Sequence, residues 1–176
     1  MTVNHLVFAA MLLCSTTASA ATSPPPSGCT TSQSHQFDFW VGTWKVFPKG
    51  SDKQVANSEI EKLYAGCAIR ESWLPRSLHL GGSLSTYVPQ KKAWRQFWVD
   101  SDGSAVDFTG GWNGKAMVLQ GVWPQPGKPN QITRMTYSPF KDGSVEQLGE
   151  TSDDGCKTWQ PGFDFLYRPQ RRGQMD

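Results

Sequence analysis

The sequence predicts an all-β protein, folded as an antiparallel up-and-down β-barrel of about ten strands. No segment of helix length shows a clean hydrophobic period of 3.6 residues. Short segments with strand character recur instead, and turn signals separate them at regular intervals. A meander of this kind must hide its edge strands, and closure into a barrel does so. A two-sheet sandwich is the competing architecture.

The turn signals place the expected strands in order. Prolines 75 and 89 end the third and fourth strands, because proline cannot donate to a strand ladder. Asp-Gly or Asn-Gly pairs at 102–103, 113–114, 142–143 and 154–155 tolerate the positive φ of hairpin turns, and a Pro-rich stretch at 124–129 separates the seventh strand from the eighth. The expected strands are 41–48, 55–64, 67–74, 82–88, 93–99, 105–112, 115–123, 131–138, 144–151 and 158–168.

Length and charge limit the classes of function. The chain has 176 residues, a one-domain length, and a formal net charge of +2 from 17 basic and 15 acidic residues. This balance argues against a nucleic-acid binder and against a polybasic membrane-surface protein. Only 18% of residues are charged and eight are Trp, which excludes disorder over most of the chain.

The first 20 residues have the pattern of a signal peptide. An apolar run at 6–14 precedes Ala18-Ser19-Ala20, a small-x-small cleavage pattern, and the run is too short to span a bilayer. A buried N-terminal helix is the alternative. We expect export to the periplasm or medium after cleavage near Ala20, with no membrane span in the mature chain. We further expect a Pro/Ser/Thr-rich extended lead-in at 21–36, a barrel domain at 37–169 and a flexible tail at 170–176.

Three cysteines remain after this cleavage, and an oxidising compartment favours one disulfide with one odd thiol. A bond between Cys29 and Cys67 would tie the lead-in to the body, although Cys156 could pair instead. No metal site is expected, because His35 and His79 are the only histidines left and neither lies near two cysteines at ligand spacing.

Strand alternation predicts which side chains face the interior. If the arginines at 70 and 95 face water, then the third strand directs Glu71 and Trp73 inward, and the fifth strand directs Gln96 and Trp98 inward. The same reasoning adds further interior candidates on the later strands. They are Trp112, Met117, Leu119, Arg134, Thr136, Val145 and Gln147.

Glu71 is the chemically demanding member of this set, because a buried carboxylate is costly unless it is paired. Arg134 is the cation that alternation offers as its partner. Three uses of the pair are open: a structural ion pair hydrogen-bonded to Gln96 and Gln147, a polar anchor for a ligand in an aromatic pocket, or acid–base catalysis by Glu71 and Arg134.

The segment FDFWVGTWKV at 37–46 resembles the opening of calycin proteins, the superfamily of lipocalins and fatty-acid-binding proteins. Their first strand carries Gly-x-Trp, here Gly42-Thr43-Trp44. The resemblance implies that Trp40 and Trp44 lie at the closed end of the barrel, and that Arg168 near the last strand covers Trp44. A planar guanidinium stacks well on an indole.

The chain is more closely similar to secreted bacterial proteins of the lipocalin-like DUF1579 type, whose activity is not established. The similar segments are FDFWVGTW at 37–44, GCAIRESW at 66–73, WRQFWVDSDG at 94–103, RMTYSPFKDGSVEQ at 134–147 and SDDGCKTWQPGFDFLYR at 152–168. Haem barrels of the nitrobindin type share the ten-strand plan and use a His near the C-terminal strands. No His follows His79 here, so no cofactor is expected.

The sequence thus predicts an exported barrel that binds a small apolar or aromatic molecule. The expected ligand-binding residues are Glu71, Trp73, Gln96, Trp98, Trp112, Met117, Arg134 and Gln147. A barrel enzyme that uses Glu71 and Arg134, and an envelope interaction protein without an internal ligand, are the alternatives. Motifs of serine hydrolases, zinc proteases and phosphate-binding loops are absent from the sequence. The oligomeric state is left open.

Overall fold

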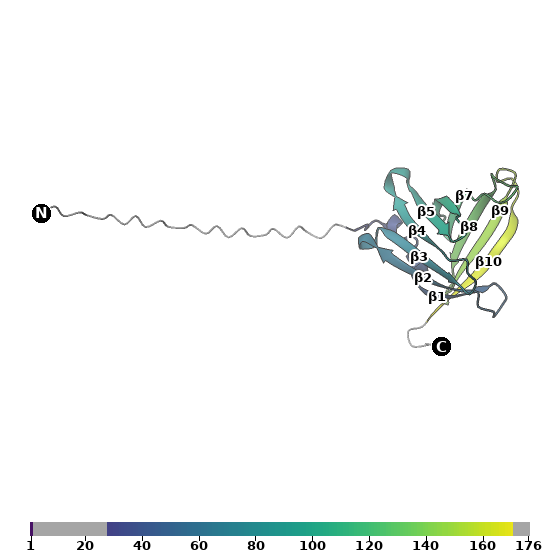
Figure 1. Cartoon of the computed structure of the whole chain (residues 1–176), viewed down its shortest axis with the longest axis horizontal. Helices are drawn as coiled ribbons and strands as arrows, with labels where there is room; N and C mark the ends of the chain where they lie inside the picture. Colours follow the sequence, from purple (N-terminus) through teal and green to yellow (C-terminus); the bar gives the residue numbers. More distant parts are fainter. Residues whose placement is uncertain (2–27, 171–176) are drawn as a thin grey trace.

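The structure is a computed structural model that describes Met1 and residues 28–170. The expected signal peptide at 1–20, the start of the lead-in and residues 171–176 of the expected tail lie outside the described residues. Ten antiparallel strands form one closed barrel, in which each strand pairs with the next along the chain and the first pairs with the last (Figure 1). The predicted fold class is therefore confirmed.

Each strand begins and ends within two residues of its expected range. The strands are β1 (Gly42–Pro48), β2 (Ala56–Leu63), β3 (Ala68–Pro75), β4 (Gly81–Val88), β5 (Ala93–Asp100), β6 (Ala105–Trp112), β7 (Met117–Val122), β8 (Ile132–Pro139), β9 (Val145–Ser152) and β10 (Gln160–Pro169). Four short 3-10 turns accompany them: η1 (Ser32–His35), η2 (Asp38–Trp40), η3 (Tyr64–Gly66) and η4 (Pro89–Lys91). In the part of the chain described, no helix is long and apolar enough to cross a membrane.

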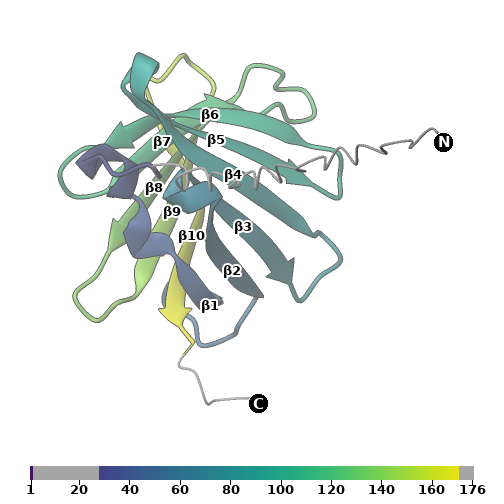
Figure 2. The ribbon, with the colours of Figure 1, turned by 90° about the vertical axis from the view of Figure 1, so that its left-hand side faces the viewer.

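Residues 37–40 seal one end of the barrel, and we call them the plug. Figure 2 shows η1 and η2 lying across the barrel end that faces the viewer. Phe37 and Trp40 are fully buried and stack with ring centroids 4.8 Å apart. Both rings also contact Tyr137 of β8, at 5.0 and 4.8 Å. Stacked and edge-on aromatic contacts of this kind stabilise the plug in addition to the burial of its apolar area.

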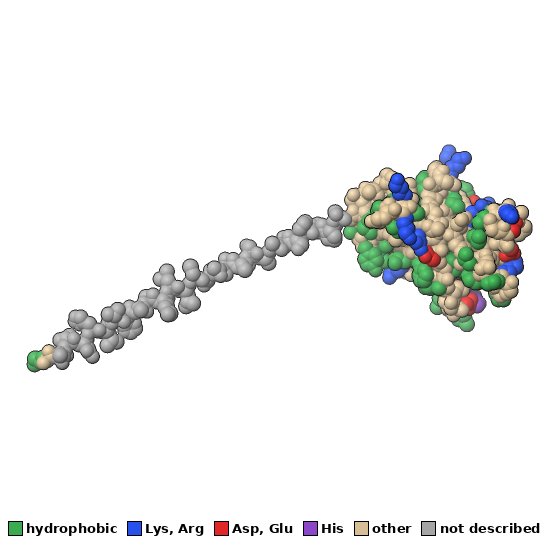
Figure 3. Space-filling model, turned by 90° about the horizontal axis from the view of Figure 1, so that it is seen from above, with side chains coloured by type: hydrophobic (Ala, Val, Ile, Leu, Met, Phe, Trp, Pro, Cys, Tyr) green, Lys and Arg blue, Asp and Glu red, His purple; other side chains and the backbone are tan. Residues whose placement is uncertain are grey.

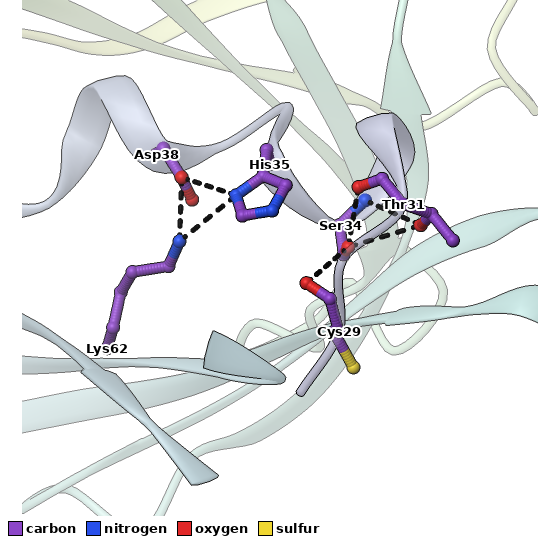
Figure 4. A network of polar contacts seen from close by, with 6 residues as sticks. All are labelled: Cys29, Thr31, Ser34, His35, Asp38 and Lys62. Atoms are coloured by element: carbon purple, nitrogen blue, oxygen red, sulfur yellow. Dashed lines mark hydrogen bonds and ion pairs between the residues drawn. The ribbon is translucent and has the colours of Figure 1, made fainter. Parts of the chain in front are cut away.

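A disulfide and a polar network hold the segment before the plug against the barrel. Cys29 is bonded to Cys67, the first of the pairings that the sequence leaves open, and Cys156 is free. Lys62 of β2 contacts the Asp38 carboxylate at 2.6 Å, and His35 contacts the same oxygen at 2.8 Å (Figure 4).

The lead-in is part of the folded domain from residue 28 onward. Ser34 is buried, and its hydroxyl donates to the carbonyl groups of Cys29 and Thr31. The indole of Trp94 donates to the Gln36 side chain at 3.3 Å. The sequence predicts an extended lead-in, whereas Ser32–His35 form the 3-10 turn η1.

The expected stack of Arg168 on Trp44 does not form. Trp44 is buried, and its indole nitrogen donates to the carbonyl of Trp40 at 3.0 Å. Arg168 points to the outside of the barrel, where its guanidinium lies 4.4 Å from the ring centre of Phe47. Tyr167, the preceding residue, takes the inward position and meets Trp44 edge-on. Gly42 lies directly against the Trp44 indole: a β-carbon at position 42 would lie 3.4 Å from that ring.

Charged side chains lie on the outer wall, several of them in pairs of opposite sign. Cross-strand pairs join Arg70 to Glu61 and Arg95 to Asp107, and Figure 3 shows blue and red side chains side by side on one face. Among the described residues, Glu71 is the only Asp, Glu, Lys or Arg that is buried.

We predict that loss of the Cys29–Cys67 bond destabilises the fold. The bond closes a loop with a sequence separation of 38, which restricts the unfolded chain and corresponds to about 4 kcal/mol in the chain-entropy description. Urea unfolding of a Cys29→Ser/Cys67→Ser double variant should show a lower midpoint, while Cys156→Ser should leave it unchanged. Equal midpoints for the unmodified protein and both variants would contradict the prediction.

Candidate functional site

The barrel interior contains a cavity of about 90 Å³ on the far side of the plug. Its lining combines buried polar side chains with partly buried aromatic rings. The buried members are Glu71, Gln96, Met135, Tyr137, Gln147 and Tyr167, and the partly buried aromatic members are Trp73, Trp98, Trp123 and Phe163. We call the first group, without Met135, the polar floor and the second group the aromatic mouth.

The aromatic mouth lies at the barrel end opposite the plug. Trp94 and Trp98 share the inner face of β5, and Trp94 contacts Phe37 of the plug, with ring centroids 5.7 Å apart. Trp98 therefore lies two inward positions farther from the sealed end, with Gln96 between the two indoles. Its indole nitrogen donates to Asp100 at 3.1 Å, and its ring packs 6.3 Å from that of Trp123.

Two glycines make room for rings of the mouth. A β-carbon at position 81 would lie 2.5 Å from the indole of Trp98, and one at position 149 would lie 2.4 Å from the ring of Phe163. Real β-carbons do not approach so closely, so the rings occupy space that any other residue at these positions would fill. The chain thus places Gly81 and Gly149 beneath two aromatic walls of the cavity.

Glu71 lies at the centre of the polar floor, held by hydroxyl groups from three other strands. Ser58 of β2 donates to Oε1 and Ser83 of β4 donates to Oε2, both at 3.1 Å. The hydroxyl of Tyr167 on β10 lies 3.4 Å from Oε1. That distance is long for a hydrogen bond between oxygens, so the two serines are the close partners of the carboxyl group.

Further hydrogen bonds continue from Tyr167 around the floor. The Tyr167 hydroxyl donates to Gln147 at 2.6 Å, and the Gln147 amide donates to the Tyr137 hydroxyl at 3.1 Å. Tyr137 donates to the Gln96 carbonyl oxygen at 3.2 Å, and the Gln96 amide donates to Ser85 at 3.1 Å. Residues of β4, β5, β8, β9 and β10 are thereby fixed relative to one another, which limits how the floor can rearrange.

Burial sets the protonation of the floor. Desolvation raises the pKa of Glu71 from 4.5 to about 7, against the lowering effect of the hydrogen bonds from Ser58 and Ser83. Desolvation also raises the pKa values of Tyr137 and Tyr167, so both phenols are neutral. The Glu71 carboxyl therefore exchanges a proton near neutral pH, while the surrounding groups stay uncharged.

Arg134 is not the partner of Glu71, and its expected inward orientation is wrong. Its guanidinium lies on the outer wall, where it bonds to Glu150 at 2.7 Å and stacks 3.9 Å from the ring centre of Trp159. The inner face of β8 carries Thr133, Met135 and Tyr137 instead. Thr136, also expected inside, shares the outer face with Arg134. The acid–base pair of the enzyme alternative therefore does not exist.

The other expected site residues divide between the two ends of the barrel. The structure brings Glu71, Trp73, Gln96, Trp98 and Gln147 together around the cavity. Their role in ligand binding stays a prediction. Trp112 and Met117 instead pair across β6 and β7 at the sealed end, where Trp112 contacts Phe39 at 5.6 Å, so they do not line the cavity.

Several residues of the site were missed by the sequence reasoning. They are Ser58, Ser83, Trp123, Met135, Tyr137, Phe163 and Tyr167. A signal was present for some of them. Aromatic residues occupy every second position of the last strand, at 163, 165 and 167. Met135 and Tyr137 have the same spacing on the eighth strand, which places them on one face.

The chemical groups of the site are few. Within residues 28–170, no group of three or more His, Cys, Asp or Glu side chains could hold a metal ion. The site offers aromatic surface, one buried acid and a ring of neutral hydrogen-bonding groups. These are the components with which small-molecule sites fix and orient a ligand.

Comparison with known proteins does not assign the chain to a family. No family model matches the sequence, and no curated protein matches it significantly.

We predict that Glu71 makes the protein less stable as pH rises. The folded carboxyl keeps its proton up to about pH 7, whereas the unfolded one loses it near 4.5, so the folded state binds more protons between these values. The free energy of unfolding should fall by about 3 kcal/mol from pH 4.5 to 7 through this group. Glu71→Gln should remove that decline.

Urea unfolding at several pH values measures the effect. Glu150→Gln is the matched control, because it removes an acid from the outer wall, and it should keep the decline. A Glu71→Gln variant with the same pH dependence as the parent would refute the assignment to Glu71.

Proposed function

We propose that this protein is a lipocalin-like binding barrel that holds a small, mainly apolar or aromatic ligand in its interior cavity. The observation that carries the proposal is a cavity with a sealed end, an aromatic mouth and a polar floor. The rings provide apolar contact, and the floor provides a few oriented hydrogen-bonding groups. This division is common in sites for small molecules.

The size of the cavity limits the ligand. A cavity of about 150 Å³ holds benzene, so the 90 Å³ available here takes a group smaller than one aromatic ring. We therefore place the polar end of the ligand on the floor and its apolar part between the rings of the mouth. Trp73 and Trp98 are partly exposed and are the side chains that such a ligand would contact first.

Membership of the calycin superfamily, and similarity to the DUF1579 type within it, form part of this proposal. Support comes from the closed ten-stranded barrel and from Gly42 and Trp44 at its sealed end. We also propose that the protein is exported. The Cys29–Cys67 disulfide supports an oxidising compartment, and the expected signal peptide would supply the route.

An interaction protein without an internal ligand is the second candidate. Leu84 and Phe97 face each other across β4 and β5 on the outer wall, and both are about half exposed. Arg70 neighbours Leu84 on one side and Asp107 neighbours Phe97 on the other. These charges limit the apolar area, so we favour the cavity.

Native mass spectrometry of protein purified from its own exported fraction tests the proposal directly. A bound molecule of small mass, released on unfolding, would support binding. A protein that carries nothing and also gives no saturation-transfer signal with benzyl alcohol would argue against it.

We predict that Trp98→Ala weakens binding of benzyl alcohol about tenfold, because loss of one aromatic contact removes about 1.4 kcal/mol. Trp159→Ala is the matched control, since this indole lies on the outer wall over Arg134. Titrations followed by ligand-observed NMR measure both variants. Equal losses in the two variants would show that the probe does not enter the mouth.

A further inference from the structure

The Glu71 carboxyl has no counter-ion, which sets it apart from several acids of the outer wall. Glu150 is paired with Arg134, Glu61 with Arg70, and Glu146 with Lys49. None of the ion pairs formed within residues 28–170 includes Glu71. A buried carboxylate without a cation is the costly arrangement that proteins usually avoid.

The hydrogen bonds around Glu71 nevertheless suit an ionised carboxylate. Each of its oxygens accepts a hydrogen bond from a serine hydroxyl, Oε1 from Ser58 and Oε2 from Ser83. A neutral acid needs an acceptor for its own proton, so one of the two serines, at 3.1 Å, would have to turn its hydroxyl hydrogen away and accept instead. The hydrogen-bond donors that stabilise a carboxylate are in place, whereas a cation that would balance its negative charge is missing among the described residues.

Aromatic rings surround the same space. Trp73, Trp98, Trp123 and Phe163 line the cavity together with Glu71. The faces of such rings attract cations, and the attraction increases where water is excluded. On the outer wall this chain already uses the interaction, because Arg134 lies over Trp159 and Arg168 over Phe47.

We infer that the ligand is a small organic cation, an ammonium group attached to an apolar body, with Glu71 as its counter-ion. The inference rests on the proposed function and adds the charge of the ligand to it. The ammonium would lie on the polar floor against Glu71, and the apolar body would lie between Trp73 and Trp98 in the mouth. A primary ammonium suits the floor because its three donors can reach the carboxylate and neighbouring oxygens.

The groups that face Glu71 leave it as the only charge at the floor. Ser58 faces it from β2, Ser83 from β4, and Tyr167 from β10, while Tyr137 lies farther along the same floor on β8. None of these groups is charged near neutral pH. Affinity for an amine should therefore follow the ionisation of Glu71 and fall as pH is lowered, about 30-fold between pH 8 and pH 5.5 for a pKa of about 7.

Three probes of nearly equal size separate charge from shape. Benzylamine is protonated at pH 8, benzyl alcohol is neutral and benzoate is negative. We expect titrations of the intact protein at pH 8 to rank benzylamine at least tenfold above benzyl alcohol, with no detectable binding of benzoate. Glu71→Gln should lower the affinity for benzylamine to the level of benzyl alcohol.

Glu150→Gln, which removes an acid from the outer wall, is the matched control and should keep the preference for the amine. The pH dependence of benzylamine binding to the unmodified protein gives a second test that requires no folded variant. Equal binding of benzylamine and benzyl alcohol would overturn the inference while leaving the binding barrel intact. Failure of all three probes at both pH values would overturn both proposals.

Discussion

The seal that Phe37 and Trp40 form across one barrel end is the contact on which the interior depends. Both rings are fully buried against side chains of the barrel wall, and the segment before them is fixed by Cys29 and Cys67. A barrel open at both ends would let water reach every inward polar group. Because this end is closed, the groups beneath the plug must find their partners within the protein.

The polar floor is the response to that requirement. Serine, glutamine and tyrosine side chains satisfy one another around the barrel, and only Glu71 brings a charge into the ring. Its serine partners stabilise the ionised form, whereas burial favours the neutral form. Burial outweighs the hydrogen bonds and raises the pKa to about 7, so the neutral and ionised forms are both populated near neutral pH. A group held in this balance responds strongly to whatever enters the cavity, since a nearby charge of either sign would shift it.

The sequence predicts the strands well because their limits are set locally, by proline and by Asp-Gly or Asn-Gly turns. It predicts the faces of β3 and β5 because Arg70 and Arg95 mark the outside. On β8 the alternation of Thr, Arg, Met, Thr and Tyr leaves the choice open, and a shift of one residue exchanges the faces. The prediction from alternation puts Arg134 on the inner face, but pairing with Glu150 on the neighbouring strand keeps it outside.

The up-and-down order of the strands also sets the order in which the molecule can assemble. Nine of the ten strand pairings join neighbours along the chain, and only β1 with β10 joins distant segments. Hairpins close short loops and form early, whereas the single seam requires the ends of the domain to meet. Trp40 contacts Tyr137 of β8 and Tyr167 of β10, so the plug can complete its contacts only when these C-terminal strands are in place. The interior is therefore sealed from water by segments from both ends of the domain.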